Sequence, residues 1–326
     1  MMLVTGGAGF IGSNLAAALA AQGHDVAVCD RLRSGDKWRN IAKIDLRDVV
    51  APEQLDDWLA INGDSVATIF HMGAISSTTE TDADLILETN FRLSRRLWEW
   101  CARNGRRLIY ASSAATYGGG EAGFEDDTSA EHLARLRPLN AYGWSKQLFD
   151  RWAVHQAHTS ERPPQWVGLK FFNVYGPNEY HKGGMQSVVA QKYGLAAAGE
   201  PVTLFRSHRQ GVADGGQLRD FIYVADCVKV MLWLLDNPKV SGIFNLGTGK
   251  ARSFADLATA LFAAVGKPAR LAYVDMPPAI RPNYQYFTEA RMERLRALGY
   301  TQPFTSLEDG IRDYVQRHLS QPDRYR

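Results

Sequence analysis

A glycine-rich turn between a short apolar strand and a helix is the feature that most constrains the fold of this chain. The run Val4-Thr5-Gly6-Gly7-Ala8-Gly9-Phe10-Ile11-Gly12 follows a strand expected over residues 2–4 and opens a helix expected over 11–21. Glycines at these spacings allow a tight turn, close approach of the backbone to a pyrophosphate, and close packing of the helix on the strand. Free N–H groups at the start of such a helix bind phosphates. The pattern therefore predicts a dinucleotide-binding unit, and a glycine-rich turn without a ligand is the alternative.

An acidic residue ends the second predicted strand, which covers residues 24–30. Asp30 is placed to accept hydrogen bonds from the ribose of an adenosine. Arg31 and Lys37 follow it, and cations at this point suit a 2′-phosphate. The sequence therefore favours NADP as the cofactor, with NAD as the other candidate. If these cations only form a solvated loop, they say nothing about the cofactor.

Strand-like and helix-like patterns alternate through the first half of the chain. Strands are expected at 2–4, 24–30, 67–71, 107–111 and 166–172, and helices at 11–21, 54–61, 83–103 and 141–157. This alternation predicts an α/β fold, a Rossmann-type doubly wound parallel sheet with helices on both faces. Polar loops after Asn173 break the rhythm, which indicates a second, smaller α/β substrate lobe. We expect discontinuous domains: 1–173 with about 218–246 for the cofactor, and about 174–217 with 247–326 for the substrate.

Composition excludes several classes of partner. The chain has 326 residues, with 37 Lys and Arg against 35 Asp and Glu, a formal net charge of +2, and no basic cluster of the kind that binds nucleic acid. The longest apolar stretches, such as 15–21, are too short for a membrane span. Three widely spaced cysteines argue against a disulfide framework or a metal cluster. With no secretion leader evident before the first strand, we expect a cytoplasmic protein and no metal site.

A tyrosine and a lysine four residues apart form the candidate reaction centre. Tyr142 and Lys146 share one face of the predicted helix 141–157. A phenol is a poor base at neutral pH, but a neighbouring ammonium and a cationic nicotinamide ring would both lower its pKa. Ser113, after the strand 107–111, can bond the same substrate oxygen. The set predicts hydride transfer at a hydroxyl or carbonyl group, and a surface helix that carries these residues by chance is the alternative.

In this order along the chain, the motifs resemble those of the extended short-chain dehydrogenase/reductase family of nucleotide-sugar enzymes. They are Gly6-x-x-Gly9-x-x-Gly12, Ser112-Ser113, Tyr142-x-x-x-Lys146, and Arg219-Asp220-Phe221 with Val224-x-Asp226, and the resemblance covers nearly the whole chain. The acid pair that follows the hydroxyl residue in the 4,6-dehydratase branch is missing after Ser113. The segments similar to the branch that epimerises ADP-heptose at C6″ are 4–14, 76–80, 110–119, 171–177, 181–185 and 244–249.

The resemblance implies a reaction in two halves for lipopolysaccharide core heptose synthesis. The C6″ hydroxyl of an ADP-heptose is oxidised to a ketone, and hydride then returns to the opposite face. Tyr142 and Lys182 would each exchange a proton on one face, whereas Lys182 could instead pair with a phosphate. Other possibilities are a different nucleotide-sugar epimerase or reductase, such as a UDP-hexose 4-epimerase, and a non-catalytic dinucleotide sensor.

The resemblance also assigns binding residues. The implied catalytic residues are Tyr142, Lys182, Ser113 and Lys146. The implied cofactor contacts are Gly6, Gly9, Phe10, Ile11, Gly12, Asp30, Arg31, Lys37, Asp45, Leu46, Met72, Gly73, Ala74, Ile75, Ser76, Asn90, Tyr142, Lys146, Val174 and Lys182. The implied contacts with an ADP-heptose substrate are Ser113, Asn173, Gly184, Gln191, Phe205, Arg206, Ser207, Arg219 and Tyr284. Gly184, Gln191 and an insertion at 208–217 depart from the family pattern, and a homo-oligomer is expected.

Overall fold

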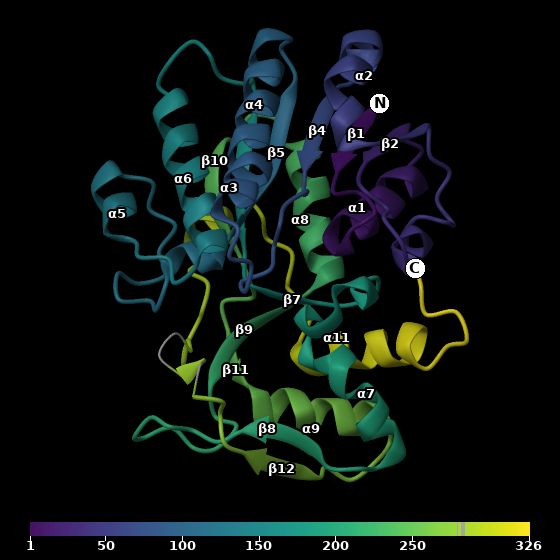
Figure 1. Ribbon diagram of the computed structural model, residues 1–326, viewed down its shortest axis with the longest axis vertical. Helices are drawn as coiled ribbons and strands as arrows, with labels where there is room; N and C mark the ends of the chain where they lie inside the picture. Colours follow the sequence, from purple (N-terminus) through teal and green to yellow (C-terminus); the bar gives the residue numbers. More distant parts are fainter. Residues whose placement is uncertain (279, 282–283) are drawn as a thin grey trace.

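A seven-stranded parallel sheet forms the centre of the larger domain (Figure 1). The computed structural model describes residues 1–278, 280–281 and 284–326. The sheet has the order β10-β6-β5-β4-β1-β2-β3. Its strands are β1 (Met2–Thr5), β2 (Val26–Cys29), β3 (Asp48–Val50), β4 (Thr68–His71), β5 (Arg107–Ser113), β6 (Trp166–Phe171) and β10 (Gly242–Leu246). Since β1 pairs with β2 on one side and β4 on the other, the strand order reverses at β1. The predicted doubly wound fold is confirmed.

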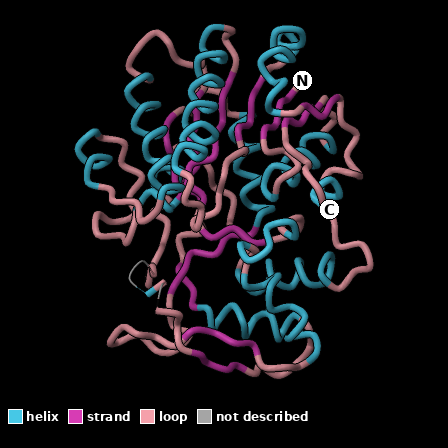
Figure 2. The backbone as a smooth tube through the Cα atoms, viewed as in Figure 1, coloured by secondary structure: helices cyan, strands magenta, loops and turns pink. Residues whose placement is uncertain are grey.

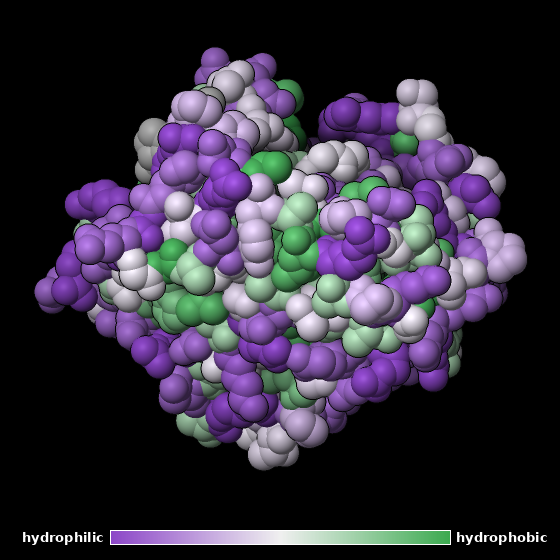
Figure 3. Space-filling model, turned by 90° about the horizontal axis from the view of Figure 1, so that it is seen from below, coloured by the Kyte–Doolittle hydropathy of each residue, from purple (hydrophilic) through white to green (hydrophobic). Residues whose placement is uncertain are grey.

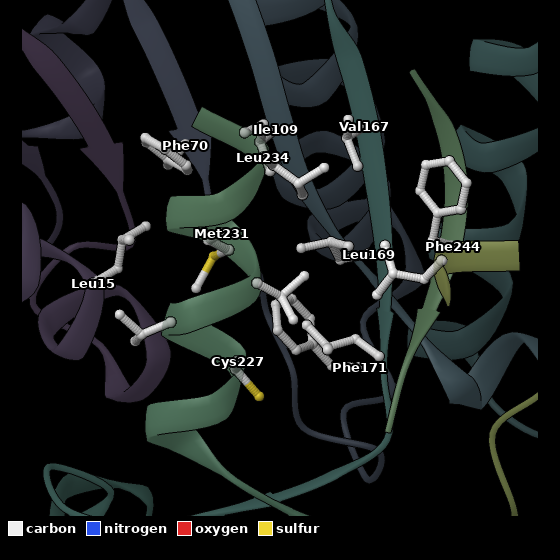
Figure 4. Packing of buried hydrophobic residues seen from close by; sticks show 14 of the residues in the cluster. Leu15, Phe70, Ile109, Val167, Leu169, Phe171, Cys227, Met231, Leu234 and Phe244 are labelled. Carbon is white, nitrogen blue, oxygen red and sulfur yellow. The ribbon is translucent and has the colours of Figure 1, made fainter. Parts of the chain in front are cut away.

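Alternate side chains of each strand build two cores on opposite faces of this sheet. Val4 and Ile109 face one core, which also holds α1 (Phe10–Ala21) and α8 (Val224–Asp236). Leu3 and Leu108 face the other, with α2 (Leu55–Asn62), α4 (Leu93–Arg103) and α6 (Ala141–Gln156). Figure 4 shows α8 lying across the strands of the first core. Helices on both faces leave the carboxyl edge of the strands free for ligands.

Two elements of the larger domain differ from the sequence prediction. The single helix expected over 83–103 is three pieces: α3 (Ala83–Ile86), the π-helix η4 (Leu87–Arg92) and α4. The wider π-turn carries Asn90, which is fully buried, toward the sheet. The short strand β3 was not predicted, because only one of its three residues, Val50, is buried. The helical pattern thus located the segment but not the break within it.

A smaller lobe lies below the main sheet in Figures 1 and 2. It has a three-stranded sheet of β11 (Ala251–Ser253), β9 (Leu218–Tyr223) and β7 (Asn173–Tyr175), and a pair of strands, β8 (Val202–Phe205) and β12 (Leu271–Val274). The helices α7 (Val188–Ala198), α9 (Phe254–Ala264) and α11 (Leu307–Tyr314) pack with these strands around a third core. Segment 218–246 therefore divides: β9 pairs in the small sheet, whereas α8 and β10 pack in the large one. The exact domain boundaries stay a prediction.

The remaining short elements complete the described chain. They are α5 (Ala130–Arg135), α10 (Glu293–Ala297), the 3-10 turns η1 (Asp36–Asn40), η2 (Pro52–Gln54), η3 (Gly63–Ser65), η5 (Ala114–Tyr117) and η6 (Tyr180–Met185), and the π-turn η8 (Val315–Leu319). None of the described helices has the length and apolar composition that a membrane crossing needs. The face seen from below is a mostly hydrophilic surface with small hydrophobic patches, as is normal for a folded domain (Figure 3).

Candidate active site

Two adjoining cavities, of about 310 and 680 Å³, open at the carboxyl edge of the large sheet. They share lining residues, among them Gly6, Asp30 and Lys182. Of the predicted site residues, the first cavity is lined by Gly6, Gly9, Phe10, Ile11, Gly12, Asp30, Lys37, Met72, Gly73, Ala74, Ser76, Ser113, Tyr142, Lys146, Val174 and Lys182. The second adds Arg31 and Ile75. Residues far apart in the sequence thus meet at one place, where ligands of such sheets bind.

The glycine turn forms one wall and tolerates no side chains at its tightest points. Gly6 has a φ of +64°, and a Cβ there would lie 2.5 Å from the backbone of Gly73. A Cβ on Gly12 would lie 2.2 Å from the carbonyl oxygen of Gly6. No side chain caps the start of α1 at Gly9. Its first N–H groups are therefore available to an anion in the cavity, and the turn fits the diphosphate of a dinucleotide.

Asp30 is held in place by the glycine turn and a nearby lysine. Its Oδ2 accepts a hydrogen bond from the N–H of Ala8 at 3.0 Å, and its Oδ1 accepts from Lys37 Nζ at 2.5 Å. The Arg31 guanidinium donates through Nε to Glu53 Oε1 at 2.7 Å. A phosphate that binds Arg31 must therefore compete with Glu53. The sequence interpretation missed this carboxylate because Glu53 comes from a different segment, η2.

The reaction centre lies at the start of α6. The Asn140 side chain accepts a hydrogen bond from the N–H of Gly143 at 2.9 Å and so caps this helix. Burial raises the pKa of the Tyr142 phenol, and a hydrogen bond with Ser113 opposes that shift. Burial lowers the pKa of the Lys146 ammonium to about 8, and the charge of Asp150 opposes it. Tyr142 is thus protonated at neutral pH and can donate a proton.

A fully buried ion pair supports Lys146 from below. Lys146 Nζ donates to the carbonyl oxygen of Ala111 at 2.7 Å. One turn further along α6, Asp150 accepts from Lys170 Nζ and from the Ser112 hydroxyl, at 2.7 and 2.6 Å. Asp150 and Lys170 are 0% and 2% exposed. Their bonds join α6 to β5 and β6, and this fixes the helix face that carries Lys146 and Tyr142.

A buried histidine links the end of β1, just before the glycine turn, to the start of α4, just after the π-helix. His71 Nδ1 accepts from the Thr5 hydroxyl at 2.6 Å, and His71 Nε2 lies 2.9 Å from the Ser94 hydroxyl. Because Ser94 donates its own hydrogen to the Asn90 carbonyl oxygen, its oxygen accepts from Nε2–H. Burial first, and the charge of Lys146 second, lower the pKa of His71 to about 3. The neutral ring can therefore both accept and donate.

Asn90 holds the loop after β4 from behind. Its Oδ1 accepts from the N–H of Ile75 at 2.8 Å, and its Nδ2 donates to the Ile75 carbonyl oxygen and to Ser145 Oγ, both at 3.0 Å. Ser145 in turn donates to the Tyr142 carbonyl oxygen at 2.7 Å. The predicted cofactor residue Asn90 therefore lies beneath the loop 72–76 and supports it, and does not line either cavity.

Lys182 reaches the same cavity from η6. The side chain is half-buried, and its Nζ lies 5.3 Å from the centroid of the Phe10 ring. Burial lowers the pKa of this ammonium, and the nearby Glu179 carboxylate raises it. The site thus holds two groups able to exchange a proton, Tyr142 on α6 and Lys182 on η6.

Several predicted binding residues lie elsewhere. Asp45 is exposed and Leu46 packs against the core before β3, and neither is among the described lining residues of the cavities. Asn173 is exposed at the start of β7. Lining residues that the sequence interpretation missed include Pro52 and His181. Pro52, in the loop after β3, lines the second cavity, whereas the contact of Asp45 and Leu46 with the cofactor stays a prediction.

The predicted substrate residues gather in the small lobe. The Arg219 guanidinium lies 5.7 and 5.3 Å from the ring centroids of Phe254 and Tyr284. The rings of Phe205 and Tyr284 meet edge to face at 6.3 Å. Arg219 donates to the carbonyl oxygens of Leu218 and Gln285. Since a guanidinium has five N–H groups, it keeps others for a ligand.

The polar substrate candidates are engaged in local bonds. Arg206 is exposed and pairs with Asp275 at 3.5 Å. The N–H of Ser207 donates to Asp214 Oδ1 at 2.8 Å, and its hydroxyl donates to the Arg209 carbonyl oxygen at 3.0 Å. Gln191 donates to the carbonyl oxygen of Gly184 at 3.1 Å. Two of the three departures from the family pattern, Gly184 and Gln191, therefore contact each other.

The comparisons with known proteins agree with this arrangement. Residues 2–247 match the NAD dependent epimerase/dehydratase family, and the chain belongs to that family. It is 48% identical, over 100% of both chains, to an ADP-L-glycero-D-manno-heptose-6-epimerase of Fusobacterium nucleatum, and 49% identical, over 100% of both, to one of Nitratidesulfovibrio vulgaris. The crystal structure of the Helicobacter pylori ADP-L-glycero-D-manno-heptose-6-epimerase is similar, with a TM-score of 0.78, 31% identity, and coverage of 96% of this chain and 94% of that one. The family predicted from the sequence is confirmed.

Removal of the Tyr142 hydroxyl tests the reaction centre. We expect Tyr142→Phe to lower turnover of a nucleotide-sugar substrate by roughly 10²–10⁴-fold, the usual contribution of a positioned acid or base. Cofactor affinity, measured by fluorescence titration, should stay near that of the wild type. Tyr193→Phe, on α7, serves as the control. An unchanged rate in Tyr142→Phe would remove this residue from the mechanism.

Proposed function

We propose that this protein is an epimerase that converts ADP-D-glycero-β-D-manno-heptose to ADP-L-glycero-β-D-manno-heptose, a step in lipopolysaccharide core heptose synthesis. The observation that carries the proposal is the meeting of Tyr142 and Lys182 in the cavity formed by the glycine turn. Inversion at one carbon needs the hydride to return to the opposite face, so the oxygen lies in a different orientation when it is protonated, and two separate elements supply proton-exchanging groups for the two orientations. Full-length relatives of 48–50% identity that are named for this reaction support the choice of sugar.

The residues present fit a nicotinamide dinucleotide. The N–H groups of α1 and the open backbone at Gly6 would hold the diphosphate, Asp30 the adenosine ribose, and Lys146 the nicotinamide ribose. When bound, the nicotinamide accepts a hydride from C6″ and returns it. NADP is our proposed form, supported by Arg31 and Lys37 beside the second cavity.

Proton exchange is the work of the chain itself. One group takes the proton of the C6″ hydroxyl as the hydride leaves, and the other gives a proton to the ketone oxygen when the hydride returns. Ser113 holds the sugar oxygen near Tyr142. The half-buried Lys182, whose pKa is lowered by burial, can lose its proton more readily than an exposed lysine.

The small lobe would bind the nucleotide of the substrate. We assign the diphosphate to Arg219, whose planar guanidinium matches phosphate oxygens, and the adenosine to the aromatic pair Phe205 and Tyr284. Three free, buried cysteines support the proposed cytoplasmic location. A homo-oligomer stays a prediction.

Substitution of Lys182 tests the proposed function. The wild type should invert C6″ of ADP-D-glycero-D-manno-heptose, followed by NMR, and leave C4″ of UDP-glucose unchanged. Lys182→Met should lower this inversion roughly 10²–10⁴-fold. The variant should still reduce a carbonyl-bearing analogue of the substrate with reduced cofactor, because the protonated Tyr142 can donate the proton, and this is seen as a loss of nicotinamide absorbance. Lys192→Met, on α7, is the matched control.

Two outcomes would contradict these assignments. Full epimerase activity in Lys182→Met would assign Lys182 to phosphate binding. Inversion of UDP-glucose at C4″ without inversion of the heptose would contradict the proposed substrate.

Cofactor preference is tested at Arg31. We expect Arg31→Ala to weaken NADP by about tenfold or more and NAD much less, since a charge-assisted hydrogen bond contributes about 1.5–3 kcal/mol. Glu53→Gln should have the opposite effect, because it removes the carboxylate that competes for this guanidinium. Dissociation constants for both cofactors measure this, with the exposed Arg47→Ala as the control. Equal losses for NADP and NAD would show that Arg31 does not contact the 2′-phosphate.

A further inference from the structure

The end of the described chain crosses back to the cofactor domain. After η8, residues 320–326, here called the strap, run up to the region of η1 and α1 in Figure 1, where the mark C stands. Most of the strap is exposed, but Tyr325 is only 6% exposed. A buried aromatic side chain in an otherwise exposed segment indicates a specific docking contact.

The strap contacts the segment that carries the second proton-transfer group. This lysine segment covers residues 178–185. The Tyr180 hydroxyl donates to the Arg324 carbonyl oxygen at 2.9 Å, and the rings of Tyr180 and Tyr325 meet at 89° with centroids 5.2 Å apart. The N–H of Arg326 donates to Asn178 Oδ1 at 3.0 Å. Both anchor residues, Asn178 and Tyr180, lie within four positions of Lys182.

On its other side the strap binds the cofactor domain. Lys43 Nζ donates to the Tyr325 carbonyl oxygen at 2.8 Å, and the Arg39 guanidinium lies 4.6 Å from the centroid of the Tyr325 ring. Arg326 Nη1 donates to the carbonyl oxygen of Asn14 in α1 at 3.1 Å. The strap thus joins the lysine segment to the helix that begins at the glycine turn.

The start of the lysine segment is held locally by the buried Glu179, whose carboxylate accepts hydrogen bonds from the N–H and the hydroxyl of Ser187. The N–H of Lys182 donates to the Glu179 carbonyl oxygen at 3.1 Å, and the residues beyond Lys182 have less local support. The segment's element η6 is a short 3-10 turn in which Gly183 has a φ of +54°, and a Cβ on Gly183 or Gly184 would contact nothing within 4 Å. Asn178 is a non-glycine residue with a φ of +72°. Short 3-10 turns and positive φ at such a residue persist only when neighbours hold them.

A second set of contacts, made by Asn40, connects the lysine segment to the glycine turn that lines the cavity. Asn40 Nδ2 donates to the carbonyl oxygens of Ala8 and Asn178, at 2.9 and 3.1 Å, and lies 3.2 Å from His181 Nδ1. The lysine segment is therefore fastened to the glycine turn through Asn40 and clamped from outside by the strap. Lys182 lies between these attachments and the Phe10 ring.

We propose that Tyr325 and Arg326 are positioning residues that hold Lys182 in the shared cavity, opposite the group on α6. The consequence for catalysis depends on the proposed function, because it assumes that Lys182 exchanges a proton. That the strap holds the lysine segment in place depends only on the contacts of Tyr325 and Arg326. Loss of the strap should free the lysine segment without loosening the parallel sheet.

Paired substitutions at Tyr325 test the proposal on the full-length protein. In Tyr325→Ala the amides of residues 178–185 should exchange with deuterium at least about tenfold faster, while those of β1 and α6 keep their rates. The kcat for the nucleotide sugar should fall about tenfold or more, with KM within about twofold of the wild type. Tyr325→Phe should match the wild type in both measurements, because the ring contacts and backbone bonds do not use the hydroxyl. Arg326→Met, which keeps the backbone bond to Asn178, should show the same changes to a smaller extent.

The outcomes separate the two proposals. If the amides of residues 178–185 exchange at the wild-type rate in Tyr325→Ala, the strap does not hold the lysine segment. If they exchange faster but kcat is unchanged, the strap holds the segment but does not position Lys182 for catalysis. If the wild type fails to invert the heptose, the proposed function fails, but the exchange measurement still decides whether the strap holds the segment. Arg317→Met, which removes the exposed pair with Asp313, controls for a general effect of nearby substitutions.

Discussion

The contact between the glycine turn and the loop after β4 sets the geometry on which the site depends. Backbone meets backbone there, since a Cβ on Gly6 would lie 2.5 Å from Gly73. This closeness follows from β1 pairing with both β2 and β4, which brings their carboxyl ends together. The neutral His71 holds the contact from below through Thr5. Because these two backbone segments lie so close together, Asp30, the start of α1 and the loop 72–76 line one cavity.

The groups proposed to exchange protons lie on two elements that differ in rigidity. Tyr142 and Lys146 stand on α6, which the buried pair of Asp150 and Lys170 joins to the sheet. Lys182 stands on a short 3-10 turn held by side chains from outside. The proposed inversion uses one group from each part. Such a site can keep the reacting atoms aligned for hydride transfer while the sugar ketone turns to present its opposite face.

Much of this could be predicted from the sequence, because the decisive patterns are local. The strand, turn and helix at 2–21 and the pair Tyr142 and Lys146 each lie within a few residues, and local spacing reports them directly. The short strand β3 escaped because two of its residues face solvent, and the π-helix escaped because its apolar pattern still reads as helical. Asp45 and Leu46 therefore precede a strand that the sequence pattern did not reveal.

The contacts that join distant segments could not be predicted. Glu53 approaches Arg31 from another element, and Tyr325 reaches Tyr180 across 145 positions of the chain. Side-chain partners at such separations depend on the finished fold, and no spacing rule reports them. The family resemblance named Lys182 correctly as a cavity residue, but it gave no indication of what holds that lysine in place.

The central claim is that one hydride leaves C6″ and returns to it. The direct measurement uses ADP-D-glycero-D-manno-heptose with deuterium at C6″ and ¹³C elsewhere in the sugar, mixed with unlabelled substrate and followed by NMR and mass spectrometry. We expect inversion with deuterium retained at C6″ of the ¹³C-labelled molecules and no hydrogen gained from water. Exchange of the C6″ hydrogen with solvent during inversion would contradict it.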